Sequence, residues 1–263
     1  MPTLSAALYR CAVTLKRLQL GKIPIDVLSF AEALDAVDRL VEAREGGFVF
    51  TPNVDHIVTV EDNPEFEAAY QRASLSLADG TPLVWASRLF DTPLPERIAG
   101  SDLVGPLLER AGQKNWRVAF LGAGPGVAEK AAAVARARWG TNVVSTDAPM
   151  VDLKDGAQLD AIGARLAEAR ADLVLMAFGA PKQELLIARI AKRVKPAVLL
   201  GIGASLDFIA GTVKRAPLLF RRTGFEWLYR LGQEPRRLWR RYLVNDPKFA
   251  LILLRSLRKA RRR

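Results

Sequence analysis

Residues 117–139, RVAFLGAGPGVAEKAAAVARARW, have the order of a strand, a glycine-rich turn and a helix. The run RVAFLG is apolar almost throughout, as strands buried on both faces of a parallel sheet are. The glycines of GAGPG allow a tight turn, and the alanine-rich segment 127–139 favours a helix. This stretch therefore predicts one βα unit, and it sets the pattern for the rest of the chain.

Apolar runs and helical segments alternate on both sides of this unit. Such alternation predicts βαβ units, and so an α/β fold with a mostly parallel, Rossmann-like sheet and helices on both faces. Ser29 and Glu32 have the spacing of a capping box at the start of one helix. We expect further strands in 23–28, 47–53, 75–80, 142–146, 172–178 and 197–203, and further helices near 29–43, 54–72, 81–90, 101–112, 156–170 and 181–194.

The positive charge of the chain is confined to its C-terminal end. The 263 residues carry a formal net charge of +11 at pH 7, and residues 221–263 contain 14 Lys and Arg against 3 acidic residues. Residues 1–220 are formally neutral and long enough for one large core. Because strand-like runs stop near residue 214, we predict an α/β domain over 1–220 and a basic helical appendage over 221–263. We expect breaks in its helices at Gly232, Pro235 and Pro247.

The appendage interleaves aromatic residues with its arginines, as at Trp227, Tyr229 and Trp239. This combination suits the headgroup layer of an anionic membrane, and the chain has no apolar run of about 18 residues that would span one. Nucleic acid would attract the same charge, but the body has no helix-turn-helix or RNA-recognition signature. We therefore predict an anionic membrane surface as a partner and no nucleic acid. A self-packing helix is the alternative, and exposed aromatic residues would allow a homo-oligomer.

Cysteine and histidine are scarce. Cys11 is the only cysteine, which excludes an internal disulfide and indicates a reducing compartment. The chain has no C-x-x-C, no Asp-x-Asp and one histidine, His56. Arg10, Lys16 and Arg17 interrupt the apolar opening, so we expect no signal peptide. These features predict a cytosolic protein without structural zinc, in contact with a membrane only at its surface.

In a parallel sheet the ligand site lies beyond the carboxyl ends of the strands. The stretch GAGPG is similar to a phosphate loop, in which the amides of Gly122, Gly124 and Gly126 would approach an anion. The G-x-G-x-x-G fingerprint is incomplete because Val127 occupies its last position, while Asp147, about twenty residues on, could bind a ribose. The alternatives are a tight turn without a ligand and a nicotinamide-dependent dehydrogenase.

Asp79 follows an apolar run and precedes Gly80, a position that suits three roles. Aspartate is a common helix N-cap or turn residue. A role as metal ligand lacks a second ligand nearby in the sequence. A carboxylate at a strand end, partly buried, can also have a raised pKa and act as a general base. The local sequence leaves the cap and the base open.

Polar residues follow another expected strand, in TPNVDH. Thr51 and Asn53 could hydrogen-bond a sugar or a base, and Asn53 could equally cap the next helix. We expect His56 to be a structural residue, because the chain has no G-x-S-x-G elbow for a serine hydrolase.

FGAPKQE places Gln183 in the first turn of a helix. Its amide can donate to a phosphate or carbonyl oxygen, or accept from a hydroxyl; a solvated helix start is the alternative. In ERIAGSDL, Arg97 could neutralise a phosphate, and we expect Asp102 to cap the helix that follows.

The order of seven motifs gives the chain a family resemblance. It resembles the WecG/TagA/CpsF family of bacterial glycosyltransferases in TPNVDH, LADG, ERIAGSDL, GAGPGVAEKAA, FGAPKQE, GIGASLDFIAGTVKRAP and GFEWLYRLGQEPRRLWRRYL. The resemblance implies an inverting, metal-independent enzyme without a cofactor, whose domain 1–220 binds a nucleotide sugar. It would move a sugar from a UDP-sugar donor to a polyprenyl-diphosphate-linked sugar acceptor, at the cytoplasmic face of the inner membrane.

The resemblance also implies roles for single residues. Asp79 would be the catalytic base, with Thr51 and Gln183 as polar residues of the active site and Arg97 on the phosphate side. The appendage would fold over the pocket at the membrane. Its arginines aimed at the donor diphosphate would be Arg230, Arg237 and Arg240.

Within the family, the whole chain is most similar to xanthan-type exopolysaccharide glucosyltransferases. That similarity implies UDP-glucose as donor, a polyprenyl-diphosphate glucose acceptor and a β-1,4 linkage. UDP-N-acetylmannosamine, the donor of several relatives, is the alternative. LADGTP departs from the more usual ADGxGV by having Pro82 and Leu83 after Thr81, beside the expected sugar contacts.

Overall fold

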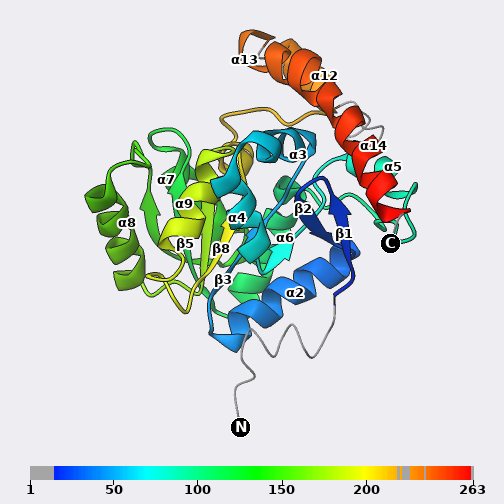
Figure 1. Cartoon of the computed structure of the whole chain (residues 1–263). Coiled ribbons are helices and arrows are strands. Elements are labelled where there is room, and N and C mark those ends of the chain that lie inside the picture. The colour runs from blue at the N-terminus through cyan, green and yellow to red at the C-terminus, as the bar shows by residue number, and fades with distance from the viewer. Residues whose placement is uncertain (1–14, 218–219, 221–225, 234, 262–263) are drawn as a thin grey trace.

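The computed structural model describes residues 15–217, 220, 226–233 and 235–261 (Figure 1). Six parallel strands form one sheet in the order β4-β3-β8-β7-β5-β6, which confirms the predicted α/β fold. Two further strands form an antiparallel hairpin. The strands are β1 Arg17–Leu20, β2 Ile23–Asp26, β3 Gly47–Phe50, β4 Leu75–Ser76, β5 Arg117–Gly122, β6 Asn142–Asp147, β7 Leu173–Ala177 and β8 Val198–Gly201.

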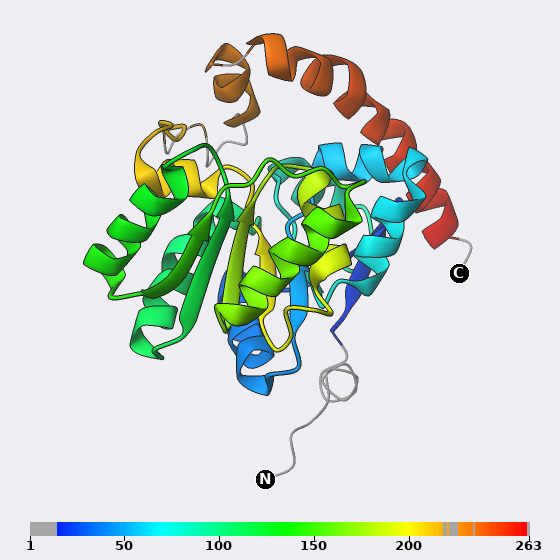
Figure 2. The same ribbon diagram turned by 90° about the vertical axis from the view of Figure 1, so that its left-hand side faces the viewer.

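Helices cover both faces of the sheet (Figure 2). Alternate side chains of β7 enter different cores: Val174 packs with the core under α4, α8 and α9, whereas Leu175 packs with the core under α2, α6 and α7. Both faces of the central strands are therefore apolar. The helices of the body are α2 Phe30–Ala43, α3 Val54–Thr59, η1 Val60–Asp62, α4 Pro64–Arg72, α5 Thr81–Ser87, α6 Gly100–Gln113, α7 Val127–Trp139, α8 Gly156–Glu168, α9 Lys182–Ile190 and α10 Ser205–Ala210.

The structure differs from the predicted elements in several places, one of which is the unpredicted short helix α10. The single helix expected over 54–72 consists of α3, the 3₁₀ turn η1 and α4, because Asn63 caps a new helix that begins at Pro64. Strand β4 has only 2 residues. Strand β1, which the sequence did not predict, pairs with β2 along its whole length.

Asp26 attaches the hairpin to the edge of the main sheet. Its buried carboxylate accepts from the guanidinium of Arg17 on β1 at 2.6 Å and from the backbone N–H of Ser76 on β4 at 2.7 Å. A buried carboxylate requires such partners, because an unpaired charge away from water is strongly destabilising. The hairpin therefore extends the structure beyond β4, the strand that leads to Asp79.

The described part of the appendage is helical and contacts the body. Ile252 of the last helix is buried against Gly21 in the hairpin turn, whose N–H donates to the Ser256 hydroxyl at 2.9 Å. The expected break at Gly232 is wrong, because Gly232 lies within a helix, whereas Pro235 begins a new one. The elements are α12 Glu226–Gln233, α13 Pro235–Arg240, the π-helical turn η2 Arg241–Asn245, the 3₁₀ turn η3 Asp246–Lys248 and α14 Phe249–Ala260.

In the part of the chain that the structure describes, no helix is both long and apolar enough to cross a bilayer. Turns η2 and η3 contact α3, the helix that follows the carboxyl end of β3. The appendage therefore stands at the carboxyl edge of the sheet, over which its helices arch in Figure 2.

Two glycines of α6 provide a test of how tightly α6 packs against α7. A Cβ on Gly112 would lie far inside contact with the carbonyl oxygen of Trp139, whereas a Cβ on Gly105 would meet nothing nearer than the Trp139 ring at 3.6 Å. We expect Gly112→Ala to lower the free energy of unfolding by about 1–3 kcal/mol through overpacking. Gly105→Ala should raise it by up to about 1 kcal/mol through helix propensity. Urea unfolding measures both, and a stabilising Gly112→Ala would contradict this packing.

Candidate functional site

The loops after β4, β3 and β8 are neighbours at the carboxyl edge, because these strands are adjacent in the sheet. The backbone N–H of Asp79 donates to the carbonyl of Pro52 at 2.8 Å, which joins the loop after β4 to the loop after β3. The hydroxyl of Thr51 donates to the carbonyl of Gly201 at 3.5 Å, which joins β3 to β8. These two hydrogen bonds bring the segments of Asp79 and Thr51 next to Gly201, which is distant from both in the sequence. The three loops thus form one continuous site.

Asp79 is not the N-cap residue of the helix that follows it. Helix α5 begins at Thr81, and its N-cap is Gly80, which has no side chain that could cap it. Gly80 has φ 153°, a conformation that residues with a Cβ rarely adopt. The N-cap interpretation of Asp79 is therefore wrong. Its half-buried carboxyl group stands at the end of β4, and its role as a base stays a prediction.

Thr51 and Asn53 have different surroundings. Thr51 is buried, and a Cβ added to Gly100 at the start of α6 would lie 3.2 Å from its hydroxyl oxygen. Asn53 caps α3, because its side-chain oxygen accepts from the N–H of His56 at 3.4 Å. The capping alternative for Asn53 is confirmed, while contacts of either residue with a ligand stay predictions.

Gln183 is buried at the start of α9 and reaches the loop after β8. Its amide oxygen accepts from the N–H of Gly203 at 3.0 Å and from the N–H of Phe178 at 3.4 Å. Its amide nitrogen donates to Oε1 of Glu184 at 2.9 Å. The sequence alternative of a solvated helix start is wrong, because the side chain is enclosed and hydrogen-bonded.

Glu184 is a buried acid that the sequence analysis did not single out. Its exposed fraction is 1%, and burial, with a smaller contribution from the charge of Asp55, raises its pKa to about 7. Hydrogen bonds from Gln183 and from its own backbone N–H act in the opposite direction on this pKa. Glutamate in a first helical turn is ordinarily solvated, so only the apolar residues that follow it, LLIA, could have indicated burial.

His56 and Tyr70 lie in the same buried region. Nδ1 of His56 and the hydroxyl of Tyr70 are 2.7 Å apart, and both side chains are buried, which confirms the structural interpretation of His56. Burial, followed by the charges of Glu184 and Asp79, raises the pKa of Tyr70 well above its usual value. Tyr70 therefore stays neutral while it lies within electrostatic reach of both acids.

Arg97 belongs to a cluster of two arginines and one aspartate. Its guanidinium donates to Asp102 at 2.8 Å, and Asp102 also accepts from Arg215 at 2.6 Å. The expected capping role of Asp102 is wrong, because the N-cap of α6 is Ala99. The N–H of Ile98, the residue after Arg97, donates to the carbonyl of Ala78, the residue before Asp79, at 2.7 Å. Arg97 therefore lies close to the loop that carries Asp79. The cluster carries one positive charge in excess beside that loop.

The glycine loop ends β5, on the far side of β7 from Thr51. Gly122 has φ 104° and lies so close to β7 that a Cβ would stand 2.6 Å from the carbonyl oxygen of Ala177. Gly126 has φ 74° at the start of α7, and Gly124 lies between them. The tight turn is present, and its binding of phosphate stays a prediction.

Asp147 is separated from the Asp79 region. It ends the edge strand β6 and forms a 2.8 Å ion pair with Arg165 beside a shallow pocket. With strands spaced by about 4.8 Å, the five steps from β4 to β6 put these two acids roughly 24 Å apart. A ribose contact of Asp147 stays a prediction and lies at the opposite end of the carboxyl edge.

The three appendage arginines are described unequally. Arg240 is exposed on α13. The side chains of Arg230 and Arg237 lie outside the described residues. Their direction toward a donor diphosphate stays a prediction.

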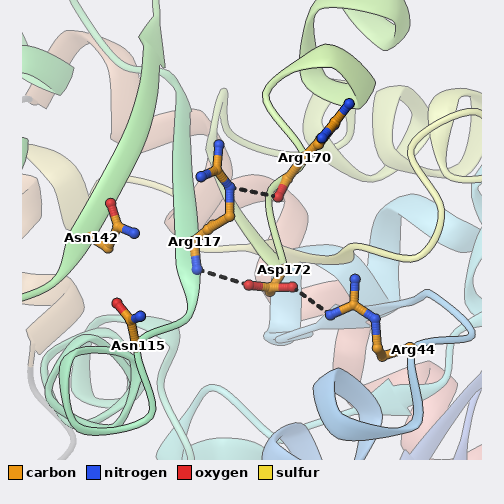
Figure 3. Close-up of a pocket in the computed structure, with 6 residues that line it drawn as sticks. All are labelled: Arg44, Asn115, Arg117, Asn142, Arg170 and Asp172. Atoms are coloured by element: carbon orange, nitrogen blue, oxygen red, sulfur yellow. Dashed lines mark hydrogen bonds and ion pairs between the residues drawn. The ribbon is translucent and has the colours of Figure 1, made fainter.

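A second pocket lies at the opposite, amino edge of the sheet (Figure 3). Three arginines and one aspartate line it, and Asp172 accepts from the guanidinium of Arg44 at 2.9 Å and from the backbone N–H of Arg117 at 2.8 Å. The guanidinium of Arg117 donates in turn to the carbonyls of Arg170 and Ala169. These bonds connect α2 with the starts of β5 and β7, so we assign this pocket a structural role. No group of acidic, histidine or cysteine residues suited to a metal ion occurs among the described residues.

Comparison with known proteins identifies the class of the protein. The chain matches the model of the glycosyl transferase WecG/TagA/CpsF family over residues 18–263. It is 35% identical over 242 residues to a Bacillus spizizenii protein named N-acetylglucosaminyldiphosphoundecaprenol N-acetyl-beta-D-mannosaminyltransferase, covering 91% of this chain and 90% of that protein.

The chain is therefore a glycosyltransferase and belongs to the WecG/TagA/CpsF family, as its motifs predicted. This membership decides against the dehydrogenase alternative. The narrower similarity to the xanthan-type glucosyltransferase GumM is not supported by this relative, whose name specifies another sugar, and it stays a prediction.

The pKa of Glu184 gives a test of its burial. Because this pKa is about 7 in the fold against 4.5 for the ordinary group, the folded chain binds more protons than the unfolded chain between these pH values. Stability must then fall as the pH rises through this interval, by about 3 kcal/mol in total. Glu184→Gln removes the titrating group and should not show this loss of stability. The difference in unfolding free energy, variant minus wild type, should therefore rise by about 3 kcal/mol from pH 4 to pH 8.

Urea unfolding at several pH values measures this difference. Every other carboxyl group titrates in both proteins and cancels from the comparison. A difference that does not change with pH would show that Glu184 is not buried as a carboxyl group.

Proposed function

We propose that this chain transfers N-acetylmannosamine from its UDP-linked form to a sugar carried on polyprenyl diphosphate, with inversion and without a metal ion. Family membership and the named activity of the Bacillus spizizenii relative support this class of substrates. The observation that carries the proposal is the half-buried Asp79, which is not the N-cap residue of α5 and whose backbone N–H donates to the carbonyl of Pro52, next to Thr51, at the carboxyl edge. One such carboxylate is sufficient for an inverting transfer.

Asp79 acts as the general base in this mechanism. It takes the proton from the acceptor hydroxyl as the oxygen attacks the anomeric carbon, on the side opposite the leaving UDP. The donor sugar must then lie over the ends of β4, β3 and β8, where Thr51 and Gln183 provide polar contacts.

Positive groups stabilise the leaving diphosphate in place of a metal ion. Arg97 and Arg215 place two guanidinium groups around the single carboxylate of Asp102, and these three residues have a formal charge of +1. Preorganised donors of this kind act where negative charge develops in the transition state. The amides of the glycine loop and the arginines of the appendage, Arg230, Arg237 and Arg240, complete the set.

The appendage docks this site on an anionic membrane, where the acceptor is held. Within the described part of the chain, six of the ten exposed large apolar side chains lie in the appendage. On α14, Ile252 faces the body while Leu251 and Leu254 face outward near Arg255 and Arg258. An apolar face with neighbouring cations suits the boundary between headgroups and acyl chains. The protein would thus be peripheral, at the cytoplasmic face of the inner membrane.

UDP-glucose is the second candidate donor. Pro82 and Leu83 replace the residues usual in the family directly after the Asp79 loop, and they lie within about 4 Å of a Cβ built on Gly80. A change this close to the base would alter the contacts of the transferred sugar. UDP release from each UDP-sugar, with polyprenyl-diphosphate acceptors in anionic vesicles and EDTA present, decides between the donors.

Asp79→Asn tests the base. We expect kcat to fall about 10²–10⁴-fold, because an amide cannot take the proton, while the Kd for the UDP-sugar changes by less than about threefold. Asp91→Asn, in the exposed loop after α5, is the control and should keep full activity. Turnover of Asp79→Asn at the wild-type rate, or loss of donor binding in the folded variant, would contradict the assignment.

Leu251→Glu combined with Leu254→Glu tests the membrane surface. These side chains are 60% and 52% exposed, so the fold should tolerate the change. Each loses an apolar contact with lipid, and we expect more than about a tenfold loss of binding to anionic vesicles in flotation. Met150→Glu, 89% exposed before α8, is the control and should bind as the wild type does.

Wild-type binding should also weaken as the salt concentration rises, because part of it is electrostatic. Unchanged binding of the double variant would place the membrane contact elsewhere. Binding to nucleic acid that matches vesicle binding, in a gel shift at the same salt, would contradict the choice of partner.

A further inference from the structure

The two orientations of the Gln183 amide are not equivalent in this structure. Its oxygen already accepts from two backbone N–H groups, those of Gly203 and Phe178. Its nitrogen already donates to Glu184. An amide oxygen has two lone pairs and an amide nitrogen has two hydrogens. Among the described residues, only the second hydrogen on Nε2 therefore has no partner.

Rotating the amide by half a turn would be unfavourable. The nitrogen would then face two N–H donors, and the oxygen would face the carboxyl group of Glu184. The two hydrogen bonds from the backbone N–H groups would be lost inside a buried region, where unpaired polar groups are most destabilising, and the third would be lost whenever Glu184 is ionised. Space is also restricted, because a Cβ on Gly201 would lie far inside contact with Nε2.

Glu184 provides the only acceptor in this arrangement, and its burial is unfavourable for the fold. Its Oε2 is buried and has no hydrogen-bond partner among the described residues. The groups that face it from neighbouring elements, Tyr70 on α4 and Asp55 on α3, supply no positive charge, and Asp79 lies beyond Tyr70. Asp160 of α8 pairs instead with Arg193 beyond the end of α9. The hydrogen bond that Glu184 accepts from Gln183 explains why a carboxyl group occupies this buried position.

We propose that Glu184 is a positioning residue for the transfer reaction: it orients the Gln183 amide so that Gln183 meets the donor sugar as a hydrogen-bond donor and not as an acceptor. The inference rests on the proposed transferase function. Gln183 reaches from α9 to the end of β8, on the Asp79 side of β7, whereas the glycine loop lies beyond β7. We therefore assign the remaining N–H to a sugar oxygen near Asp79, and not to the part of the diphosphate that the glycine loop would bind.

Kinetics of four variants test this role. Glu184→Gln keeps an acceptor oxygen, so kcat/KM should stay within about threefold of the wild type. Glu184→Leu and Gln183→Leu should each lower kcat/KM for the UDP-sugar at least about tenfold, as expected for loss of one hydrogen bond at the reacting sugar. Both should bind UDP alone within about threefold of the wild type. Glu65→Leu removes another glutamate that contacts α9, through its ion pair with Arg189, and should have no effect.

Three results would overturn the proposal. They are equal losses in Glu184→Gln and Glu184→Leu, full activity of Glu184→Leu, and UDP affinity that falls as much as turnover. Glu184→Met serves in place of Glu184→Leu if the latter does not fold. Thermal unfolding of each variant separates misfolding from loss of orientation.

A second measurement does not depend on activity. In the full chain with ¹⁵N-labelled glutamine, the side-chain amide of Gln183 is assigned by its absence in Gln183→Leu. Its two hydrogens should give widely separated signals with slow exchange in the wild type and in Glu184→Gln. In Glu184→Leu the separation should narrow toward that of a solvent-exposed glutamine, and an unchanged spectrum there would refute the orienting bond. If the spectra are as expected but the protein transfers no sugar, the hydrogen bond between Gln183 and Glu184 is supported and the proposed transferase function is rejected.

Discussion

All six strands of the main sheet run in one direction, and the arrangement of the site depends on this constraint. A parallel sheet is buried on both faces, so its strands leave almost no place for polar side chains along their length. Polar groups therefore gather where the strands end. Thr51, Asp79 and Gln183 come from three different loops, yet adjacency of the strands brings their loops together.

The ion pairs at the two edges of the sheet lie in different surroundings. At the amino edge, Asp172 accepts from the guanidinium of Arg44 and from the backbone N–H of Arg117, whose guanidinium donates to backbone carbonyls. At the carboxyl edge, Asp102 accepts from two guanidinium groups, those of Arg97 and Arg215. Each set contains two arginines and one aspartate, so formal charge does not distinguish them. They differ in position, because only the second lies beside the loop that carries Asp79.

Sequence reasoning predicted the sheet well, because long apolar runs between helical segments leave few alternative folds. It missed β1, whose charged and polar residues alternate with buried leucines in only four positions. It left the role of Asp79 open, because the choice depends on whether Gly80 or Asp79 caps α5, which is a matter of backbone geometry.

Local sequence patterns could not predict which residues are buried by contacts between distant elements. Glu184 has the sequence position of a solvated helix start, and only the packing of α4 against α9 encloses it. The same applies to Arg215, which lies in the loop after α10 and forms its ion pair with Asp102, over a hundred residues earlier in the sequence. Periodicity reports which face of one element is buried, but it cannot report which distant element covers that face.

A buried acid of this kind also affects how the protein can change over generations. Burial raises the pKa of Glu184, so the ionised form of this acid opposes folding at neutral pH and above. A laboratory selection for heat resistance alone is then expected to favour its replacement by an apolar residue. The same selection should leave the glycine at position 201 in place, because a side chain there would meet Gln183.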